Sequence, residues 1–264
     1  MSFRTSLLIA RGLAALALVS GLLAAPAFAN EGGAVDHAPI NMGDKASLQR
    51  GARTFANYCQ NCHSAQYLRY SKLTEIGLSE DEIKSNLMFA SEKIGDTMTV
   101  ALDKAEAKQW FGVVPPDLSV EARVRGADWL YTYLRTFYKD PSRPTGWNNL
   151  AYPNVGMPHV LYELQGVQKL EEVKPAAEAG EGKGEGEKKE AGTEHHKKLV
   201  LAVPGKMTAL EYDQFTADLV NYLVWMAEPA RATRVQIGVL VIFFLTLTFF
   251  LMLALKKEFW KDIH

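Results

Sequence analysis

The sequence predicts an all-α domain with long loops, exported from the cytoplasm and held to a membrane by one C-terminal helix. Between the two ends, apolar residues recur at helical spacing, and no alternating strand pattern of useful length competes. Residues 235–255, VQIGVLVIFFLTLTFFLMLAL, are uncharged and almost entirely apolar. About 20 such residues form a helix that spans the hydrocarbon core of a bilayer.

The first 29 residues have the organisation of a secretory signal peptide. Basic residues precede an apolar run, which closes with the small-residue pattern Ala27-Phe28-Ala29. We expect cleavage before Asn30, because the apolar run of residues 12–25 is short for an uncleaved membrane helix. Export to the periplasm follows for the body of the chain, residues 30–230.

The export signal also sets the expected orientation of the anchor. Arg231 and Arg234 precede it and three lysines follow it, so the positive-inside rule alone discriminates weakly. We expect a single-pass protein of the bacterial inner (cytoplasmic) membrane with residues 256–264 in the cytoplasm.

The positive and negative charges of the chain are nearly balanced. The chain has 29 Lys and Arg against 30 Asp and Glu; without residues 1–29, which contain Arg4 and Arg11, 27 face 30, a formal charge of −3. Such a near-balance gives no reason to expect nucleic acid as a partner.

Four helices are predicted in the exported body. The first runs through LQRGARTFANYC and leads directly to Cys59, and the second begins at Ser79, with Glu82 completing a capping box. A third begins near Ala127 and ends at Asp140-Pro141, and the last covers residues 208–226, before a kink at Glu228-Pro229. Loops are expected at 113–119, 140–149 and 151–160.

A polar insertion precedes the last helix. Residues 171–194 contain eight Glu and four Lys, with Val173 as the one large apolar residue. Such a composition buries too little surface to offset chain entropy, so residues 171–198 are expected to form a flexible, solvated segment. A tolerated surface insert is favoured over an acidic arm that attracts a basic partner.

The string Cys59-Gln60-Asn61-Cys62-His63 indicates covalent haem attachment. Two thiols at this spacing form thioethers with the two vinyl groups of one haem, and the adjoining imidazole becomes an axial ligand of the iron. A thioredoxin-like dithiol is disfavoured because a helix precedes the motif, and a zinc site lacks further cysteine ligands. With two cysteines in the chain, one haem c is expected.

The sixth iron ligand must come from elsewhere in the chain. The best candidate is Met157, because Gly156 permits close approach of the backbone and Pro158 restrains the thioether. His159 is the main rival. Methionine ligation implies a relatively high potential. The other methionines considered, for which core packing is the default where a helix carries them, are Met42, Met88, Met98, Met207 and Met226.

Two arginines are candidates for pairing with the haem propionates. Arg123 and Arg125 follow the PPDLS segment, and a guanidinium matches a carboxylate in two-point geometry. The residues alone favour ordinary surface arginines.

Several motifs in order resemble the cytochrome c1 family. They are CHSAQYLRYSKL from Cys62, PPDLS at 115–119 followed by RVR at 123–125, the loop with Met157, and MAEP at 226–229 before a single anchor. The likeness extends from about residue 46 to 257. The insertion at 171–194 departs from the family pattern.

The resemblance implies a class I cytochrome c-like haem domain, in which Cys59 and Cys62 hold haem c, His63 and Met157 are the axial ligands, and Arg123 is the preferred propionate partner. It implies a non-catalytic electron-transfer subunit of ubiquinol:cytochrome c oxidoreductase, assembled with cytochrome b and a Rieske iron–sulfur protein. The Rieske protein would reduce this haem, which would reduce a soluble or anchored cytochrome c.

Two alternatives remain at this point. Another membrane-anchored monohaem cytochrome that donates to an oxidase would share the haem motif and the anchor, but would not require PPDLS. A haem-based sensor would keep the sixth coordination position of the iron open. Binding of Met157 to the iron would close this position, which argues against a sensor.

Overall fold

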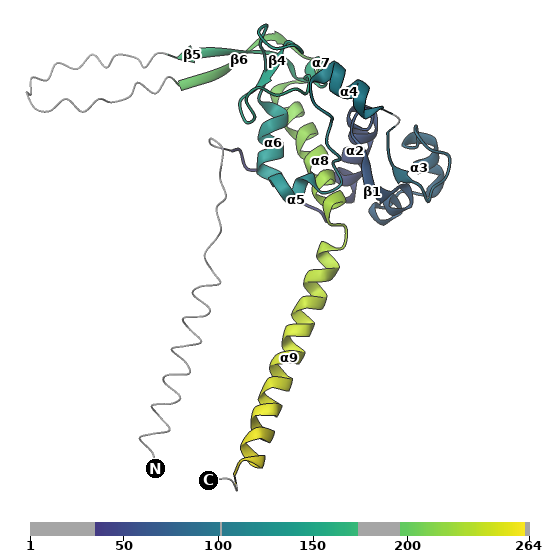
Figure 1. The fold of residues 1–264 in the computed structure, drawn as a ribbon, viewed down its shortest axis with the longest axis vertical. Helices are drawn as coiled ribbons and strands as arrows, with labels where there is room; N and C mark the ends of the chain where they lie inside the picture. Colours follow the sequence, from purple (N-terminus) through teal and green to yellow (C-terminus); the bar gives the residue numbers. More distant parts are fainter. Residues whose placement is uncertain (1–34, 101, 174–195, 262–264) are drawn as a thin grey trace, which may run out of the picture. The chain divides into compact units, whose positions relative to one another are not determined.

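The computed structural model describes residues 35–100, 102–173 and 196–261 (Figure 1). The signal-peptide prediction for residues 1–29 and most of the predicted insertion, residues 174–195, lie outside the described residues.

The first described helix leads into the CxxCH motif at residues 59–63, as predicted. Helix α2 (Lys45–Thr54) begins after Asp44, whose side chain accepts a hydrogen bond from the Ser47 backbone N–H at 3.1 Å. It continues as a π-helical turn, η1 (Phe55–Cys59), which closes with a bond from the Gln60 N–H to the Phe55 carbonyl at 2.9 Å. Such turns concentrate at functional sites, and this one ends on Cys59.

Helix α8 (Ala209–Ala227) forms the centre of the core. It begins with a capping box between Thr208 and Glu211 and lies beside α2, α5 (Glu121–Arg125) and α6 (Ala127–Arg135) (Figure 1). Leu219, Val220 and Tyr222 of α8 are fully buried. The Arg50 side chain joins α2 to α8 through two hydrogen bonds to Asp218, at 2.6 and 2.9 Å.

Gly51 allows α2 and α8 to approach closely. A Cβ added there would lie 2.2 Å from the Asp218 carbonyl oxygen and 2.6 Å from the Tyr222 Cβ. Because both atoms belong to α8, the backbone of α2 or α8 would have to move to accommodate a side chain at residue 51.

Gly51→Val is therefore expected to lower the free energy of unfolding by about 3 kcal/mol or more, at or above the usual cost of overpacking. Gly95→Ala is the matched control, since a Cβ there meets nothing within 4 Å. Denaturant unfolding of the two variants checks this; equal midpoints would contradict the importance of the α2–α8 contact.

The remaining elements are short. Helical segments are η2 (Tyr70–Ile76), α3 (Glu80–Asn86), α4 (Lys104–Phe111) and α7 (Tyr162–Gln165). Within the described ranges the strands form three antiparallel pairs: β1 (Ala65–Arg69) with β2 (Thr97–Met98), β3 (Phe137–Lys139) with β4 (Trp147–Asn149), and β5 (Gly166–Val173) with β6 (His196–Pro204). The predicted capping box at Ser79 is confirmed.

The strand pairs correct two expectations. Helix α6 ends at Arg135 rather than at Asp140, because the chain turns extended at Phe137 to pair with β4. The fold is mostly helical, as predicted, although strands that show no alternating pattern in the sequence form within the described residues. In particular, residues 171–173 and 196–198, placed in the predicted flexible segment, belong to the paired strands β5 and β6.

A break separates the core from the C-terminal helix, as predicted. Glu228 has φ −155° and ψ 72°, and α9 (Arg231–Phe259) follows after Pro229. Across the break, the carboxylate of Glu228 pairs with the Arg234 guanidinium at 2.6 Å. Of the helices in the described part of the chain, residues 233–259 alone are long and apolar enough to cross a membrane.

Candidate functional site

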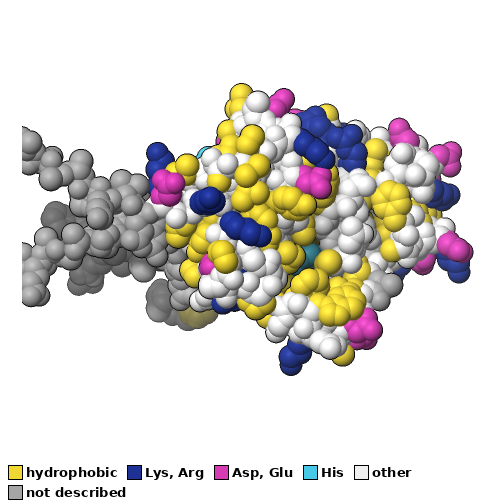
Figure 2. Space-filling model, turned by 90° about the horizontal axis from the view of Figure 1, so that it is seen from above, with side chains coloured by type: hydrophobic (Ala, Val, Ile, Leu, Met, Phe, Trp, Pro, Cys, Tyr) yellow, Lys and Arg dark blue, Asp and Glu magenta, His cyan; other side chains and the backbone are white. Residues whose placement is uncertain are grey.

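An open cavity of about 440 Å³ lies between the Cys59–His63 turn, the 111–118 segment, α5, α6, the 152–160 loop and α8. Of the residues that line it, Glu121 and Arg125 alone carry a formal charge, apart from the titratable His63. In the space-filling view, hydrophobic side chains gather around a recess on this face (Figure 2). The cavity therefore suits a mostly apolar group with a polar end.

The attachment motif forms one wall of this cavity. The Cys62 and His63 backbone N–H groups both donate to the Cys59 carbonyl, at 3.1 and 2.9 Å, so a tight turn brings both thiols and the imidazole to the wall. Burial raises the pKa of the Cys59 thiol to about 12 and also raises the pKa of Cys62. A reactive redox dithiol needs a lowered thiol pKa, so this environment disfavours the thioredoxin-like alternative.

The imidazole of His63 is oriented for ligation. Its Nδ1 lies 2.8 Å from the Pro116 carbonyl oxygen, and only an Nδ1–H donates to that oxygen. This tautomer leaves the Nε2 lone pair for a metal, an arrangement common to metal-binding histidines. Burial lowers the pKa of His63, which favours the neutral imidazole that ligation requires.

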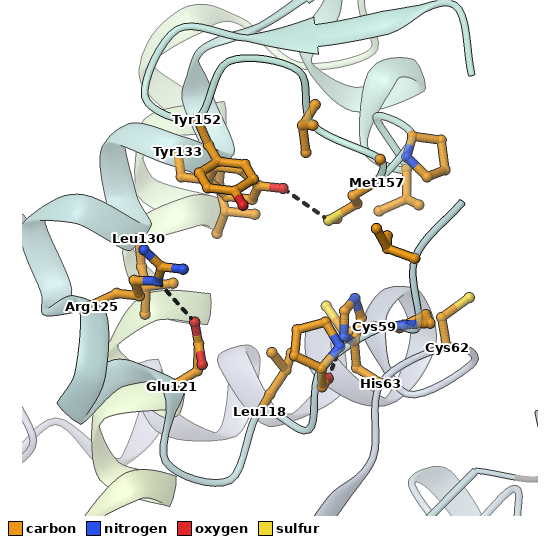
Figure 3. Close-up of a pocket in the computed structure, with 18 of the residues that line it drawn as sticks. Cys59, Cys62, His63, Leu118, Glu121, Arg125, Leu130, Tyr133, Tyr152 and Met157 are labelled. Atoms are coloured by element: carbon orange, nitrogen blue, oxygen red, sulfur yellow. Dashed lines mark hydrogen bonds and ion pairs between the residues drawn. The ribbon is translucent and has the colours of Figure 1, made fainter. Parts of the chain in front are cut away.

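The thioether of Met157 lies across the cavity from His63. Figure 3 shows both side chains pointing into the space between them. The neighbouring Gly156 makes the predicted close approach: an added Cβ would lie 2.8 Å from Val113 Cγ2 and 3.0 Å from the Phe111 carbonyl oxygen. The 111–113 segment thus packs directly on the loop that carries Met157.

The other candidate ligands lie elsewhere. Met98 and Met226 are buried in the core, and Met88 packs against it. None of these three methionines lines the cavity, and Met42 and Met207 do not line it either.

His159, the predicted rival, also does not line the cavity. Its ring stacks on Phe137 at 4.9 Å between ring centres and meets Trp147 edge-on at 5.2 Å. Burial lowers its pKa to about 4. His159 is thus a packed aromatic neighbour of the Met157 loop in this structure.

The structure brings Arg125 rather than Arg123 to the cavity. Both arginines are exposed, but Arg125 lines the cavity and pairs with Glu121 at 3.2 Å, whereas Arg123 is not part of the lining. The Arg125 guanidinium carbon lies 4.9 Å from the Trp129 ring centre and 5.7 Å from that of Tyr152. Ion pairing and cation–π contacts of this kind hold a guanidinium in place.

Sequence reasoning missed a column of cavity residues. Glu121, Arg125, Trp129 and Tyr133 all line the cavity and recur every four residues. Glu121 and Arg125 belong to α5, whereas Trp129 and Tyr133 belong to α6, and the two helices are separated at Gly126, whose φ is 86°. The spacing rule for one continuous helix would therefore not have selected Arg125 over Arg123.

These donors fit a haem and not a bare metal ion. A neutral imidazole and a thioether face each other, two thiols lie beside the imidazole, and one arginine supplies a cationic end. Within the described ranges, no cluster of three or more His, Cys, Asp or Glu side chains is placed to hold a metal.

The chain matches one family model and is similar to several known proteins. The family model described as "Cytochrome C1 family" matches residues 36–171 and 206–263. The chain is 48% identical over 250 residues to the ammonia monooxygenase gamma subunit of Nitrosomonas europaea, covering 94% of this chain and 97% of that protein. It is 44% identical over 253 residues to cytochrome c1 of Allochromatium vinosum, covering 94% and 99%.

Among solved structures, the chain is similar to one of a "Hyperthermophilic respiratory Complex III". The match has 17% identity and a TM-score of 0.40, and it covers 98% of this chain and 99% of that one.

Proposed function

This chain belongs to the cytochrome c1 family, and from that premise we propose that it is the electron-transferring haem c subunit of a respiratory quinol:cytochrome c oxidoreductase. Proteins of this family carry one covalently bound haem c. The observation that carries the proposal is the opposition of His63 and Met157 across an apolar cavity, directly beside the two thiols of Cys59 and Cys62.

Each residue has a separate task in holding the group. Cys59 and Cys62 would provide the thioether sulfurs, and His63 and Met157 would provide a nitrogen and a sulfur to the iron. The haem would supply a reversible one-electron couple, while the protein contributes ligands, burial and orientation. The Pro116 carbonyl fixes the His63 tautomer, and the apolar lining excludes water. No bond of a substrate is made or broken, so no catalytic acid or nucleophile is required.

We propose that Arg125, rather than Arg123 as the family resemblance implies, pairs with a haem propionate. Arg125→Gln removes a cationic group from the cavity and is expected to lower the haem potential, because it makes the free energy of one-electron reduction less favourable by an amount on the order of 1 kcal/mol: the lost positive charge had favoured the reduced form. Arg123→Gln, which removes an equal charge from an exposed site outside the cavity, is the matched control.

Potentiometric titration of both variants measures this effect. If the potential shifted more in Arg123→Gln than in Arg125→Gln, Arg123 rather than Arg125 would be the propionate partner.

The proposed electron path runs from a Rieske iron–sulfur protein to this haem and on to a soluble or anchored cytochrome c, within a complex that contains cytochrome b. We propose that residues 30–230 form the periplasmic haem domain after removal of residues 1–29. Residues 235–255 then cross the inner membrane once and residues 256–264 face the cytoplasm. The length and apolarity of α9 support the anchor.

Isolation from native membranes in mild detergent tests the assignment to this complex. We expect an affinity-tagged chain to co-purify with a b-type cytochrome and an iron–sulfur protein that has a Rieske-type spectrum. Isolation with an oxidase instead would reject the assignment.

A second candidate follows from the relative named as an ammonia monooxygenase gamma subunit, which is 48% identical. The same haem site could serve electron transfer to a membrane monooxygenase. Co-purification with monooxygenase subunits, without a b-type cytochrome, would favour this candidate.

A further inference from the structure

The Tyr133 hydroxyl contacts the sulfur that we assign to the haem iron. Its Oη lies 3.4 Å from Met157 Sδ, in hydrogen-bonding geometry (Figure 3). A thioether sulfur has two lone pairs and accepts hydrogen bonds weakly. One lone pair is therefore free to bind iron while the other accepts from the phenol.

The phenol is held in a fixed position. Its ring stacks on Trp129 at 4.9 Å and 10° between planes, and meets Phe137 edge-on at 5.0 Å. The Tyr133 carbonyl accepts a hydrogen bond from Asn149 Nδ2 at 2.7 Å, which ties this turn of α6 to β4. Tyr133 is partly buried against the core, and a phenol hydroxyl donates one hydrogen bond.

The ring of Phe137, which meets the Tyr133 ring edge-on, contacts the Met157 loop at a second point. Phe137, four residues after Tyr133, stacks on His159, two residues after Met157, with 3° between the ring planes. The loop is thus fixed on both sides of Pro158: by a hydrogen bond to the sulfur and by a ring stack.

We propose that Tyr133 is a positioning residue that orients the Met157 thioether and raises the haem potential by hydrogen-bonding to its sulfur. The inference rests on the proposed role of Met157 as a ligand. A donor on the second lone pair draws electron density from the sulfur, which then stabilises the oxidised iron less. Loss of the donor also frees the thioether to change its configuration.

Tyr133→Phe tests this, because it removes one hydroxyl and keeps the ring in the stack. We expect the midpoint potential to fall, so that the ratio of oxidised to reduced haem at a fixed applied potential rises about 2- to 10-fold, the range of one modest hydrogen bond. The sulfur-to-iron charge-transfer band should shift, and added imidazole should displace Met157 faster.

Tyr131→Phe is the matched control. It removes a phenol from the same helix, but Tyr131 does not line the cavity and its ring lies against the Arg135 guanidinium, 4.4 Å away. Its potential and band should equal those of the unmodified protein. Unfolding midpoints of both variants separate tuning from general destabilisation.

The outcomes separate this inference from the proposed function. Equal potentials and bands in Tyr133→Phe and Tyr131→Phe, with the charge-transfer band present, would overturn the role of Tyr133 and leave Met157 as ligand. A missing band in the unmodified protein would overturn the ligand assignment itself, and with it the inference.

Discussion

Replacement of Cys59 and Cys62 together by serine is expected to abolish covalent haem attachment almost completely. Serine hydroxyls do not form thioethers with vinyl groups, and these are the two cysteines of the chain. His63 and Met157 would remain, but two axial bonds do not hold a haem through denaturation. Haem staining after denaturing electrophoresis, at equal protein load, measures the loss.

Asn61→Ser is the matched control for this change. It introduces a serine between the cysteines, at an exposed side chain that donates to the Asn57 carbonyl, and leaves both thiols in place. Normal staining of the control together with loss in the double variant supports the assignment. Equal staining of both proteins would show that attachment depends on other groups.

Met157→Leu is expected to have the second-largest effect. The haem should stay attached, because Cys59, Cys62 and His63 are untouched, but its potential should fall by an amount on the order of 0.2 V, within the ~0.8 V range that axial ligands set. The charge-transfer band should disappear, and the ferrous haem should bind carbon monoxide readily. Redox titration and absorption spectra measure all three effects.

Met226→Leu is the control for loss of a methionine as such. Met226 is buried in α8 and does not line the cavity, and such volume-conserving swaps usually cost under ~1.5 kcal/mol. Its potential should be unchanged. If Met157→Leu also left the potential unchanged, another residue would be the ligand, and His159, two positions further on, would be the next to test.

Local signals in the sequence predicted much of this molecule. The CxxCH pattern needs five consecutive residues, and the capping box at Ser79 needs four, so no distant part of the chain is required to recognise them. Length and apolarity were enough for the candidate membrane helix. The break at Glu228 followed from the proline after it.

Distant pairing explains what local signals missed. Strands β5 and β6 are adjacent in space, with Glu171 opposite Lys198, but far apart in sequence, so neither strand shows a hairpin signal. The choice between Arg123 and Arg125 depended on the direction in which each side chain of α5 points. The contact of Tyr133 with Met157 joins α6 to a loop 24 residues later, which periodicity does not reveal.

The state of the two cysteines tests the central claim most directly. The purified protein is denatured without reductant, treated with a thiol-alkylating reagent, and examined by absorption and intact-mass spectrometry. We predict a coloured chain whose mass is increased by one haem, with neither Cys59 nor Cys62 alkylated. A colourless chain in which both thiols are alkylated would contradict the account.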